Sequence, residues 1–201
     1  MAALLLGDQR LLVREFQLDT ENPSMDKIEH ILHVRMKSIA CIMGINAYYN
    51  TCAKNYFDRK ILLSRQHLYN WFMPYIKRGG KVLDAGCGPG LDIQAFLNQG
   101  FVVEAFEASS EMVKLAIQHT QHQVSCLKFE ELEKVESFDA IWANASLVHY
   151  SSEELPEIFF RFLRALKYDG YWYMVFRHGS GVEMHDQIPF YKQTENSLQS
   201  I

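Results

Sequence analysis

A short apolar strand that runs directly into a glycine-rich turn is the feature that most constrains this chain. Residues 81–90 read KVLDAGCGPG and are followed by a helical pattern at Leu91–Asn98. A strand, a glycine turn and a helix in this order let a ligand approach backbone N–H groups closely. The spacing is G-x-G-x-G, whereas a dinucleotide fingerprint requires glycine where this chain has Leu91. A Walker phosphate loop is excluded as well, because no Gly-Lys-Ser or Gly-Lys-Thr follows.

From Lys81 onward, short apolar runs alternate with helical stretches, which is typical of a parallel sheet with crossover helices. The expected strands are Val82–Ala85, Val102–Phe106, Val124–Leu127, Phe138–Ala143 and Tyr171–Phe176. The expected helices are Leu91–Asn98, Ser109–His119 and Ser152–Lys167. The fold class is therefore α/β, a Rossmann-like and mostly parallel sheet of about five recognisable strands.

The chain before Gly80 reads as a helical extension. Apolar residues recur every three or four positions between Met25 and Met43, and a second helical pattern from Ser64 to Tyr75 is disturbed by Pro74. The aromatic stretch at 46–60 resists assignment. Residues 1–23 show weak patterning, and we expect a poorly anchored arm there. The predicted organisation is an N-terminal arm and helical cap segment over 1–80, and a ligand-binding domain over 81–201.

Charge and cysteine usage narrow the function classes. The 201 residues hold 20 basic and 24 acidic side chains, a net charge of -4, without the basic excess typical of nucleic-acid binding. Residues 1–80 carry 11 basic against 7 acidic residues and the remainder 9 against 17, which indicates a mildly basic segment over an acidic core. The four cysteines include no C-x-x-C pair. The longest stretch without a charged residue or histidine spans only 16 residues, so we expect a cytoplasmic protein without a membrane span.

Two carboxylates suggest which ligand the turn accepts. Asp84 lies two residues before the first glycine, where it can receive an ammonium group but would repel a pyrophosphate. Glu107 ends the second strand, 21 residues after Gly86, where an acidic side chain can accept both hydroxyls of a ribose. Glu104 competes for that role, but strand alternation turns it to the opposite face, and we expect it to be solvated or structural.

Several motifs in order resemble the class I S-adenosyl-methionine-dependent methyltransferases. They are DAGCGPG at 84–90, FEASSEM at 106–112 and FDAIWANASLVHY at 138–150. Within this superfamily the chain is most similar to the small-molecule group related to tellurite-resistance methyltransferases. The similarity extends to YYNTCAKNYF, which resembles the segment that closes over the cofactor, and to LKYDGYWYMVFRHGSG, so it covers about residues 46–198. It implies S-adenosyl-L-methionine as cofactor and a methyltransferase domain over 81–201.

The resemblance also raises a question about the sheet, because the family closes it with two more strands, the last antiparallel. Those two strands are not recognisable in the 25 residues after Phe176. Three alternatives are open. The chain is naturally shortened, the amino-terminal segment covers the edge, or another subunit covers it in a homodimer, since an unprotected edge strand invites association.

Carried over residue by residue, the resemblance implies a cofactor site and a cleft for the acceptor. Asp84, Gly86, Cys87, Gly88 and Gly90 would surround the methionine part, and Glu107 would hold the ribose. Ala108, Ser109 and Met112 would border the adenosine, with Phe129 and Glu130 at the adenine ring. Asn144, Ala145 and His149 would line the cleft, with Tyr48, Tyr49 and Tyr56 as candidates for the closing segment. The eight histidines offer no metal-binding spacing, so no metal site is expected.

Methyl transfer from a sulfonium is an in-line displacement, for which positioning and exclusion of water account for most of the acceleration. Where the acceptor must lose a proton, His149 is the candidate general base, although it can equally be a supporting hydrogen-bond donor. The residues Asn144-Ala145-Ser146-Leu147 do not match the [DN]-P-P-[FY] motif of amino-group methyltransferases that act on nucleic acid. A small-molecule acceptor is therefore favoured, with neither a nucleic acid nor a membrane as partner.

Three functions remain open at this point. The first is an active methyltransferase for a small-molecule acceptor. The second is a catalytically weakened or inactive S-adenosyl-methionine-binding protein with an interaction or regulatory role. The third is a nicotinamide oxidoreductase, which Leu91 in place of glycine disfavours.

Overall fold

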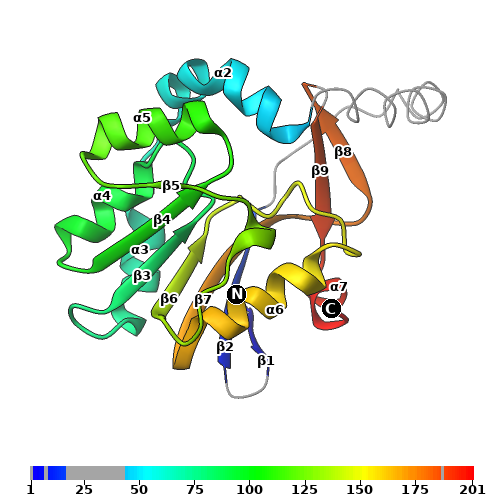
Figure 1. Ribbon diagram of the computed structural model, residues 1–201. Helices are drawn as coiled ribbons and strands as arrows, with labels where there is room; N and C mark the ends of the chain where they lie inside the picture. The colour runs from blue at the N-terminus through cyan, green and yellow to red at the C-terminus, as the bar shows by residue number, and fades with distance from the viewer. Residues whose placement is uncertain (1, 7–8, 17–43, 187) are drawn as a thin grey trace, which may run out of the picture.

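A central sheet between two layers of helices organises the molecule (Figure 1). The structure is a computed structural model that describes residues 2–6, 9–16, 44–186 and 188–201. The strands are β1 (Ala2–Leu6), β2 (Gln9–Phe16), β3 (Lys81–Ala85), β4 (Val102–Glu107), β5 (Ser125–Cys126), β6 (Phe138–Ala143), β7 (Leu166–His178), β8 (Val182–His185) and β9 (Ile188–Gln193). The helices are α2 (Ile45–Lys60), α3 (Gln66–Phe72), α4 (Leu91–Asn98), α5 (Ser110–Thr120), α6 (Leu155–Ala165) and α7 (Glu195–Gln199), with short 3₁₀ turns at Met73–Tyr75 and Phe129–Glu131. The helix expected between Met25 and Met43 lies outside the described residues.

The sheet has the order β1-β2-β7-β6-β3-β4-β5. All neighbours from β2 to β5 are parallel, and β1 is antiparallel to β2. The chain order reverses beside β3, which lies between β4 and β6. In open α/β sheets, ligands bind at the carboxyl ends of the strands at such a switch point. The expected α/β, Rossmann-like and mostly parallel fold is therefore confirmed.

Successive side chains of the central strands pack into two separate hydrophobic cores, one on each face of the sheet. On the face covered by α3, α4 and α5, the rings of Trp142 and Tyr173 stack with their centroids 3.9 Å apart. On the face covered by α6, Trp172 packs edge-on against Phe159 and Phe162, at 4.7 and 5.0 Å. Because Trp172 and Tyr173 are consecutive, β7 contributes an aromatic ring to each core, which is the burial pattern of a sheet covered on both sides.

The amino-terminal segment corrects one expectation. Residues 1–23 were expected to form a poorly anchored arm, but they contain β1 and β2, and β2 pairs in parallel with β7 from Arg10 to Phe16. Of the three alternatives for the sheet edge, the structure shows coverage by the amino-terminal segment. The count of about five strands was too low because it lacked β1 and β2, and also β8 and β9. A strand paired with a partner some 160 positions later has no local signal beyond a short apolar run.

Local boundaries differ in two further places. The helix expected over Ser152–Lys167 begins at Leu155 and ends at Ala165, where the chain turns extended and enters β7. The pair Asp169-Gly170, a sequence typical of turns, is instead an irregular part of β7. Asp169 has a φ of 60°, and the pairing register with β6 shifts there. The strand pair β8 and β9, which the sequence did not predict, forms an antiparallel hairpin, and β9 pairs with the end of β7.

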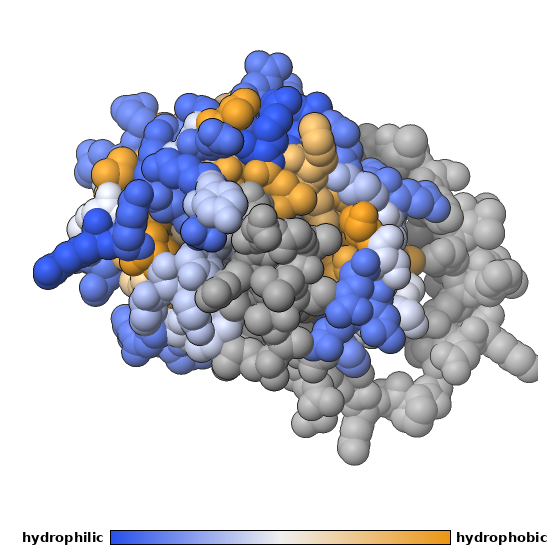
Figure 2. Space-filling model, turned by 90° about the horizontal axis from the view of Figure 1, so that it is seen from below, coloured by the Kyte–Doolittle hydropathy of each residue, from blue (hydrophilic) through white to orange (hydrophobic). Residues whose placement is uncertain are grey.

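In the coloured part of the face seen from below, hydrophilic residues lie along the margin, with smaller hydrophobic groups between them (Figure 2). Among the described residues, no helix combines the length and the apolar character that crossing a membrane requires. The domain boundary predicted at residue 80 stays a prediction. It falls between the 3₁₀ turn at Met73–Tyr75 and the start of β3.

Candidate active site

A cavity of about 310 Å³ lies at the carboxyl ends of β3, β4 and β6, at the switch point of the sheet. This volume is at the lower end of the range of about 300–1,000 Å³ that is usual for small-molecule pockets. Helix α2 covers this end of the sheet (Figure 1) and contributes Tyr49 and Tyr56 to the lining. The cavity thus has a floor of strand ends and a roof formed by a helix.

The glycine turn forms one wall of the cavity. Gly86 and Gly88 have φ angles of 70° and 53°, in the left-handed region that favours glycine. The turn is fixed to β4, because the N–H groups of Gly86 and Cys87 both donate to the Phe106 carbonyl at 3.0 Å. A Cβ at Gly88 would meet no atom within 4 Å. The turn therefore leaves open space for a ligand beside its backbone.

Gly90, the third glycine of the turn, has a different environment. It caps the start of α4 and does not line the cavity. A Cβ there would lie 3.1 Å from the Cβ of Ala116 on α5. Gly90 therefore permits close packing of α4 against α5. This packing shapes the turn, although Gly90 itself does not reach a ligand in the cavity.

Glu107 ends β4 with its carboxylate in the cavity. One oxygen accepts a hydrogen bond from the Gly88 N–H at 3.0 Å, and the other accepts one from the Ser109 N–H at 2.8 Å. Burial raises the pKa of this carboxyl group, and the two N–H donors oppose that shift. Since a carboxylate offers about four acceptor positions, both oxygens retain capacity for further donors such as ribose hydroxyls.

Asp84 lies beneath the turn instead of in the cavity wall, and its side chain is only 1% exposed. Its Oδ2 atom has no hydrogen-bond partner among the described residues. Burial, together with the carboxylates of Asp92 and Glu107, raises the pKa of Asp84 well above its usual range. A buried carboxylate oxygen without a donor is one that a cationic group nearby would satisfy, directly or through water.

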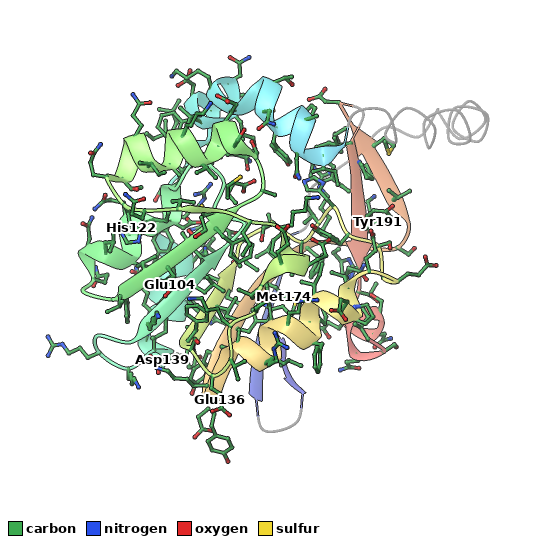
Figure 3. All side chains as sticks on the ribbon, viewed as in Figure 1. Glu104, His122, Glu136, Asp139, Met174 and Tyr191 are labelled. Carbon is green, nitrogen blue, oxygen red and sulfur yellow. The ribbon has the colours of Figure 1, made fainter. Side chains whose placement is uncertain are left out.

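Glu104, the competitor of Glu107, does not line this cavity. Its carboxylate forms ion pairs with Lys81 at 2.6 Å and Lys134 at 3.1 Å. Figure 3 shows Glu104 near Asp139, in the part of the sheet that faces away from α2. The structural role expected for Glu104 agrees with these contacts.

Asn50 of α2 joins the helix to the start of α5. The Ser109 hydroxyl donates to the Asn50 side-chain oxygen at 2.7 Å, and the Glu111 N–H donates to the same oxygen at 3.2 Å. Ser109 is completely buried and also caps α5, by accepting from the Met112 N–H. Ser109 therefore positions the roof of the cavity and is not itself part of the lining.

Asp92 is the centre of a buried hydrogen-bond network that the sequence did not reveal. One oxygen accepts from Arg65 at 3.0 Å and from the Tyr69 hydroxyl. The other accepts from Trp142 at 3.0 Å and from Asn144 at 3.2 Å. The network ties the segment after α2 to α4 and β6, and it holds Asn144 at the cavity wall.

His149 and Tyr49 form a hydrogen-bonded pair at the opposite wall. The Nδ1 atom of His149 lies 2.7 Å from the Pro189 carbonyl, which can only accept, so Nδ1 carries the proton. Nε2 consequently accepts from the Tyr49 hydroxyl, also at 2.7 Å. Burial, and secondarily the charge of Arg177, lowers the pKa of His149 and favours the neutral ring. A neutral imidazole with a basic Nε2 is suited to take up a proton.

The cavity brings together most of the residues that the sequence singled out. Those in its lining are Gly86, Cys87, Gly88, Glu107, Ala108, Met112, Phe129, Glu130, Asn144, Ala145, His149, Tyr49 and Tyr56. Asp84, Gly90 and Ser109 lie outside the lining, and Tyr48 faces a neighbouring cavity. Lining residues that the sequence did not single out include Asn46, Arg65, Asp92, Lys128, Tyr150 and Glu154. Only Asp92 had a usable signal, as an acidic residue in the first turn of the helix after the glycines.

Comparison with known proteins finds sequences similar to this chain. Residues 82–170 match the family model described as a methyltransferase domain. A malonyl-[acyl-carrier protein] O-methyltransferase of Erwinia billingiae (strain Eb661) is 36% identical over 75 residues. That match covers 35% of this chain and 29% of the relative, so the chain matches less than a third of the length of that protein.

Solved structures share the fold. A protein of Pyrococcus horikoshii OT3 superposes with a TM-score of 0.59 at 20% identity, covering 70% of this chain and 82% of its own. The 1,6-didemethyltoxoflavin-N1-methyltransferase of Burkholderia thailandensis, solved with 1,6-didemethyltoxoflavin and S-adenosylhomocysteine, gives a TM-score of 0.58 at 22% identity. It covers 90% of this chain and 79% of its own. At these identities the likeness concerns the fold.

Proposed function

We propose that this chain, which belongs to the class I S-adenosyl-L-methionine-dependent methyltransferases, transfers a methyl group from that cofactor to a small-molecule acceptor. This family and this cofactor are the ones expected from the sequence motifs in the glycine turn and in the strands that follow it. The narrower similarity to tellurite-resistance methyltransferases stays a prediction.

One observation carries the proposal: the glycine turn and Glu107 face a single cavity at the switch point of the sheet. The residues fit the cofactor by their chemistry. Gly88 leaves open space, Glu107 offers carboxylate oxygens for a ribose, and the partnerless Oδ2 of Asp84 suits the ammonium group. Ala108, Met112, Phe129 and Glu130 would border the adenosine, with Asn144 and Ala145 toward the methyl group.

The acceptor end of the cavity is assigned to Tyr49, Tyr56 and His149. S-adenosyl-L-methionine supplies an electrophilic methyl group when bound, so the protein has to align the acceptor and exclude water. Tyr49 and Tyr56 lie edge-on with ring centroids 5.8 Å apart and close the site beneath α2. His149 accepts the proton of an acceptor that must lose one, at Nε2.

A small acceptor is supported by three observations. The cavity is small, a structural neighbour is a methyltransferase solved with 1,6-didemethyltoxoflavin, and the net charge of -4 provides no general attraction for nucleic acid. The proposal includes a cytoplasmic location, which the four cysteines without paired spacing favour. Association into a homodimer stays a prediction.

The alternative, a cofactor-binding protein with weak or no turnover, also has an observation in its favour. Both ring nitrogens of His149 are engaged within the protein, so an acceptor has to displace or share the Tyr49 hydroxyl to reach Nε2. Turnover distinguishes the two functions, whereas cofactor binding does not.

The test is binding followed by turnover. Calorimetry with S-adenosyl-L-methionine, S-adenosylhomocysteine and NAD should show binding of the first two only, and binding of NAD alone would overturn the methyltransferase function. Release of S-adenosylhomocysteine is then measured over a panel of small acceptors. Release with one member of the panel supports the proposal, and its absence from a broad panel supports the non-catalytic alternative.

A further inference from the structure

A second cavity lies beside the first and shares Tyr49 and Tyr56 with it as a dividing wall. Its volume is about 270 Å³, and it is bordered by α2, the end of β7 and the β8–β9 hairpin. Its apolar wall consists of Leu63, Ile188 and Phe190. A molecule in this space can therefore contact the tyrosine whose hydroxyl is bonded to His149.

Cations outnumber carboxylates around this second cavity. Arg59, Lys60 and Arg177 line it, against Asp186 as the one acidic side chain of the described lining. Asp186 accepts a hydrogen bond from the Tyr48 hydroxyl at 3.0 Å. His185 also lines the cavity and is paired with Glu183 behind it.

The positive charge of Arg177 is already balanced by other groups of the protein. Its guanidinium lies over the Phe190 ring, 4.1 Å from the centroid, and pairs with Glu183 at 3.2 Å. Glu183 also pairs with Lys192 at 3.3 Å, so its charge is shared. Arg177 therefore forms a rigid wall of the cavity, with little free capacity for an anion.

Lys60 differs, because it has no carboxylate partner at ion-pair distance within the part of the chain that the structure describes. Its ammonium lies 5.6 Å from the centroid of the Tyr56 ring. Burial, with the nearby guanidiniums of Arg65, Arg59 and Arg177, lowers the pKa of Lys60. Among the described residues, Arg59 donates a hydrogen bond to the Asn55 carbonyl, which is neutral, and forms no ion pair. Two adjacent cations without a counter-ion at the wall of a cavity are an environment that an anion stabilises.

We propose that the second cavity binds the body of the methyl acceptor, whose reacting end lies at Tyr49 and His149, and that this acceptor is a small apolar molecule with an anionic group held by Lys60 and Arg59. The proposal rests on the proposed function, since it assigns the acceptor of that reaction. The nucleophilic atom of the acceptor lies toward Tyr49 and the first cavity. Its lone pair forms the new bond to the methyl carbon, the carbon–sulfur bond breaks and its electron pair stays on sulfur. The acceptor proton passes to Tyr49 as the Tyr49 proton moves to Nε2 of His149.

The experiment uses the protein saturated with S-adenosylhomocysteine and three probes of similar shape: benzoate, phenyl phosphate and neutral benzamide. Calorimetry is performed on the natural sequence, on Lys60→Met and on the control Lys54→Met. Lys54 is an exposed lysine on the same helix that pairs with Asp58. We expect the anionic probes to bind the natural protein at least about tenfold more tightly than benzamide, and Lys60→Met to remove about that factor. Lys54→Met should leave all three affinities unchanged.

Equal affinity for benzoate, phenyl phosphate and benzamide would overturn the anionic acceptor, as would an unchanged anion affinity in Lys60→Met. The affinity for S-adenosylhomocysteine is measured in every variant and shows that the first cavity is intact. If the natural protein does not bind S-adenosylhomocysteine at all, the proposed function fails and the acceptor role fails with it. Binding of that molecule without anion preference contradicts the acceptor assignment alone.

Discussion

His149 shows at the scale of one residue how burial and hydrogen bonding decide a protonation state. The Pro189 carbonyl fixes the proton on Nδ1, and the Tyr49 hydroxyl occupies Nε2. The lowered pKa means that the folded state holds this ring neutral where the unfolded chain would protonate it. Its contribution to stability is therefore complete at neutral pH and is lost as the pH falls below about 6.5, the ordinary value of histidine.

Replacement of His149 by glutamine tests its role as a base. For an acceptor that loses a proton, we expect the variant to lower kcat by about 10²- to 10⁴-fold, because general-base assistance disappears. S-adenosylhomocysteine affinity should stay within about threefold, since the glycine turn and Glu107 are unchanged. Turnover across pH 5–9 is the measurement, and an unchanged kcat would contradict the assignment.

Gly86 provides a second prediction, with a matched control. Alanine at this position would place its Cβ 2.6 Å from the Cβ of Ser146 and 2.9 Å from Phe129, at a φ of 70°. Gly100 has a similar φ of 80°, but no atom lies within 4 Å of its Cβ position. Gly100→Ala therefore measures backbone strain alone, of about 1–2 kcal/mol.

We expect Gly86→Ala to lower the free energy of unfolding further than Gly100→Ala and to weaken S-adenosylhomocysteine binding, because the turn must move. Chemical denaturation and calorimetry measure the two effects. Equal losses in both variants would show that the space between Ser146 and Phe129 does not constrain the turn.

The glycine turn and Glu107 could be predicted because strand, turn and helix lie within a short segment with characteristic spacing. The hydrogen-bond partners of Asp92 and Asn50 could not be predicted. Asp92 meets Arg65 and Trp142, 27 and 50 positions away, and Asn50 meets Ser109 after 59 positions. A polar side chain in a helix has many solvent-exposed alternatives, and only the folded arrangement shows which partner it has.

At the scale of elements, α2 is the helix on which both cavities depend. The sequence left 46–60 unassigned because the segment has no clear apolar face, and Ala53 is its one buried residue. Its three tyrosines, Tyr48, Tyr49 and Tyr56, face two cavities instead of a core. Polar contacts therefore position this helix, with Asn50 at the start of α5 as one anchor.

Asn50→Ala should loosen α2 without unfolding the sheet. Three hydrogen bonds to the Asn50 side-chain oxygen disappear, from Ser109, Ser110 and Glu111, and a typical hydrogen bond has a net contribution of about 1 kcal/mol. We expect faster amide hydrogen exchange in α2 and weaker S-adenosylhomocysteine binding. Asn55→Ala, at an exposed position of the same helix, is the control. Identical exchange rates in the two variants would contradict the anchoring role.

The central strands were predictable because both of their faces are buried. Val82–Ala85 and Phe138–Ala143 therefore read as nearly continuous apolar runs, and each pairs with a neighbouring strand on either side. The β8–β9 hairpin was not, because its residues are mostly half-buried and charged or polar side chains interrupt the run. Pairing with the end of β7 supplies what the local pattern lacks.

At the scale of the whole molecule, ion pairs join the described part of residues 1–80 to the more acidic remainder of the chain. Arg65 pairs with Asp92, and Lys77 pairs with Asp139 at 2.8 Å, so ion pairs join the two parts. The sheet joins them too, because β2 lies along β7. No local pattern in residues 1–23 indicates a partner more than 150 positions away, which explains why the sheet edge stayed an open question.

Removal of residues 1–16 should uncover the edge of β7 and leave its backbone groups unpaired. We expect a lower midpoint of thermal unfolding and concentration-dependent self-association, because an exposed strand edge pairs with another chain. Light scattering and calorimetric melting measure both. At temperatures below the unfolding transition, the shortened protein should bind S-adenosylhomocysteine with unchanged affinity, since the cavity is built from β3, β4, β6 and α2. A monomer with an unchanged melting temperature would contradict this role of β2.

The most direct test of the cofactor site compares Glu107→Ala with Glu104→Ala by calorimetric titration with S-adenosylhomocysteine. Both variants remove a carboxylate from β4, but only Glu107 faces the cavity, while Glu104 pairs with Lys81 and Lys134. We predict that Glu107→Ala weakens binding by about 100-fold or more, as expected for two charged hydrogen bonds to a ribose. Glu104→Ala should bind as the natural protein does. Undiminished affinity in Glu107→Ala would contradict the placement of the cofactor in this cavity.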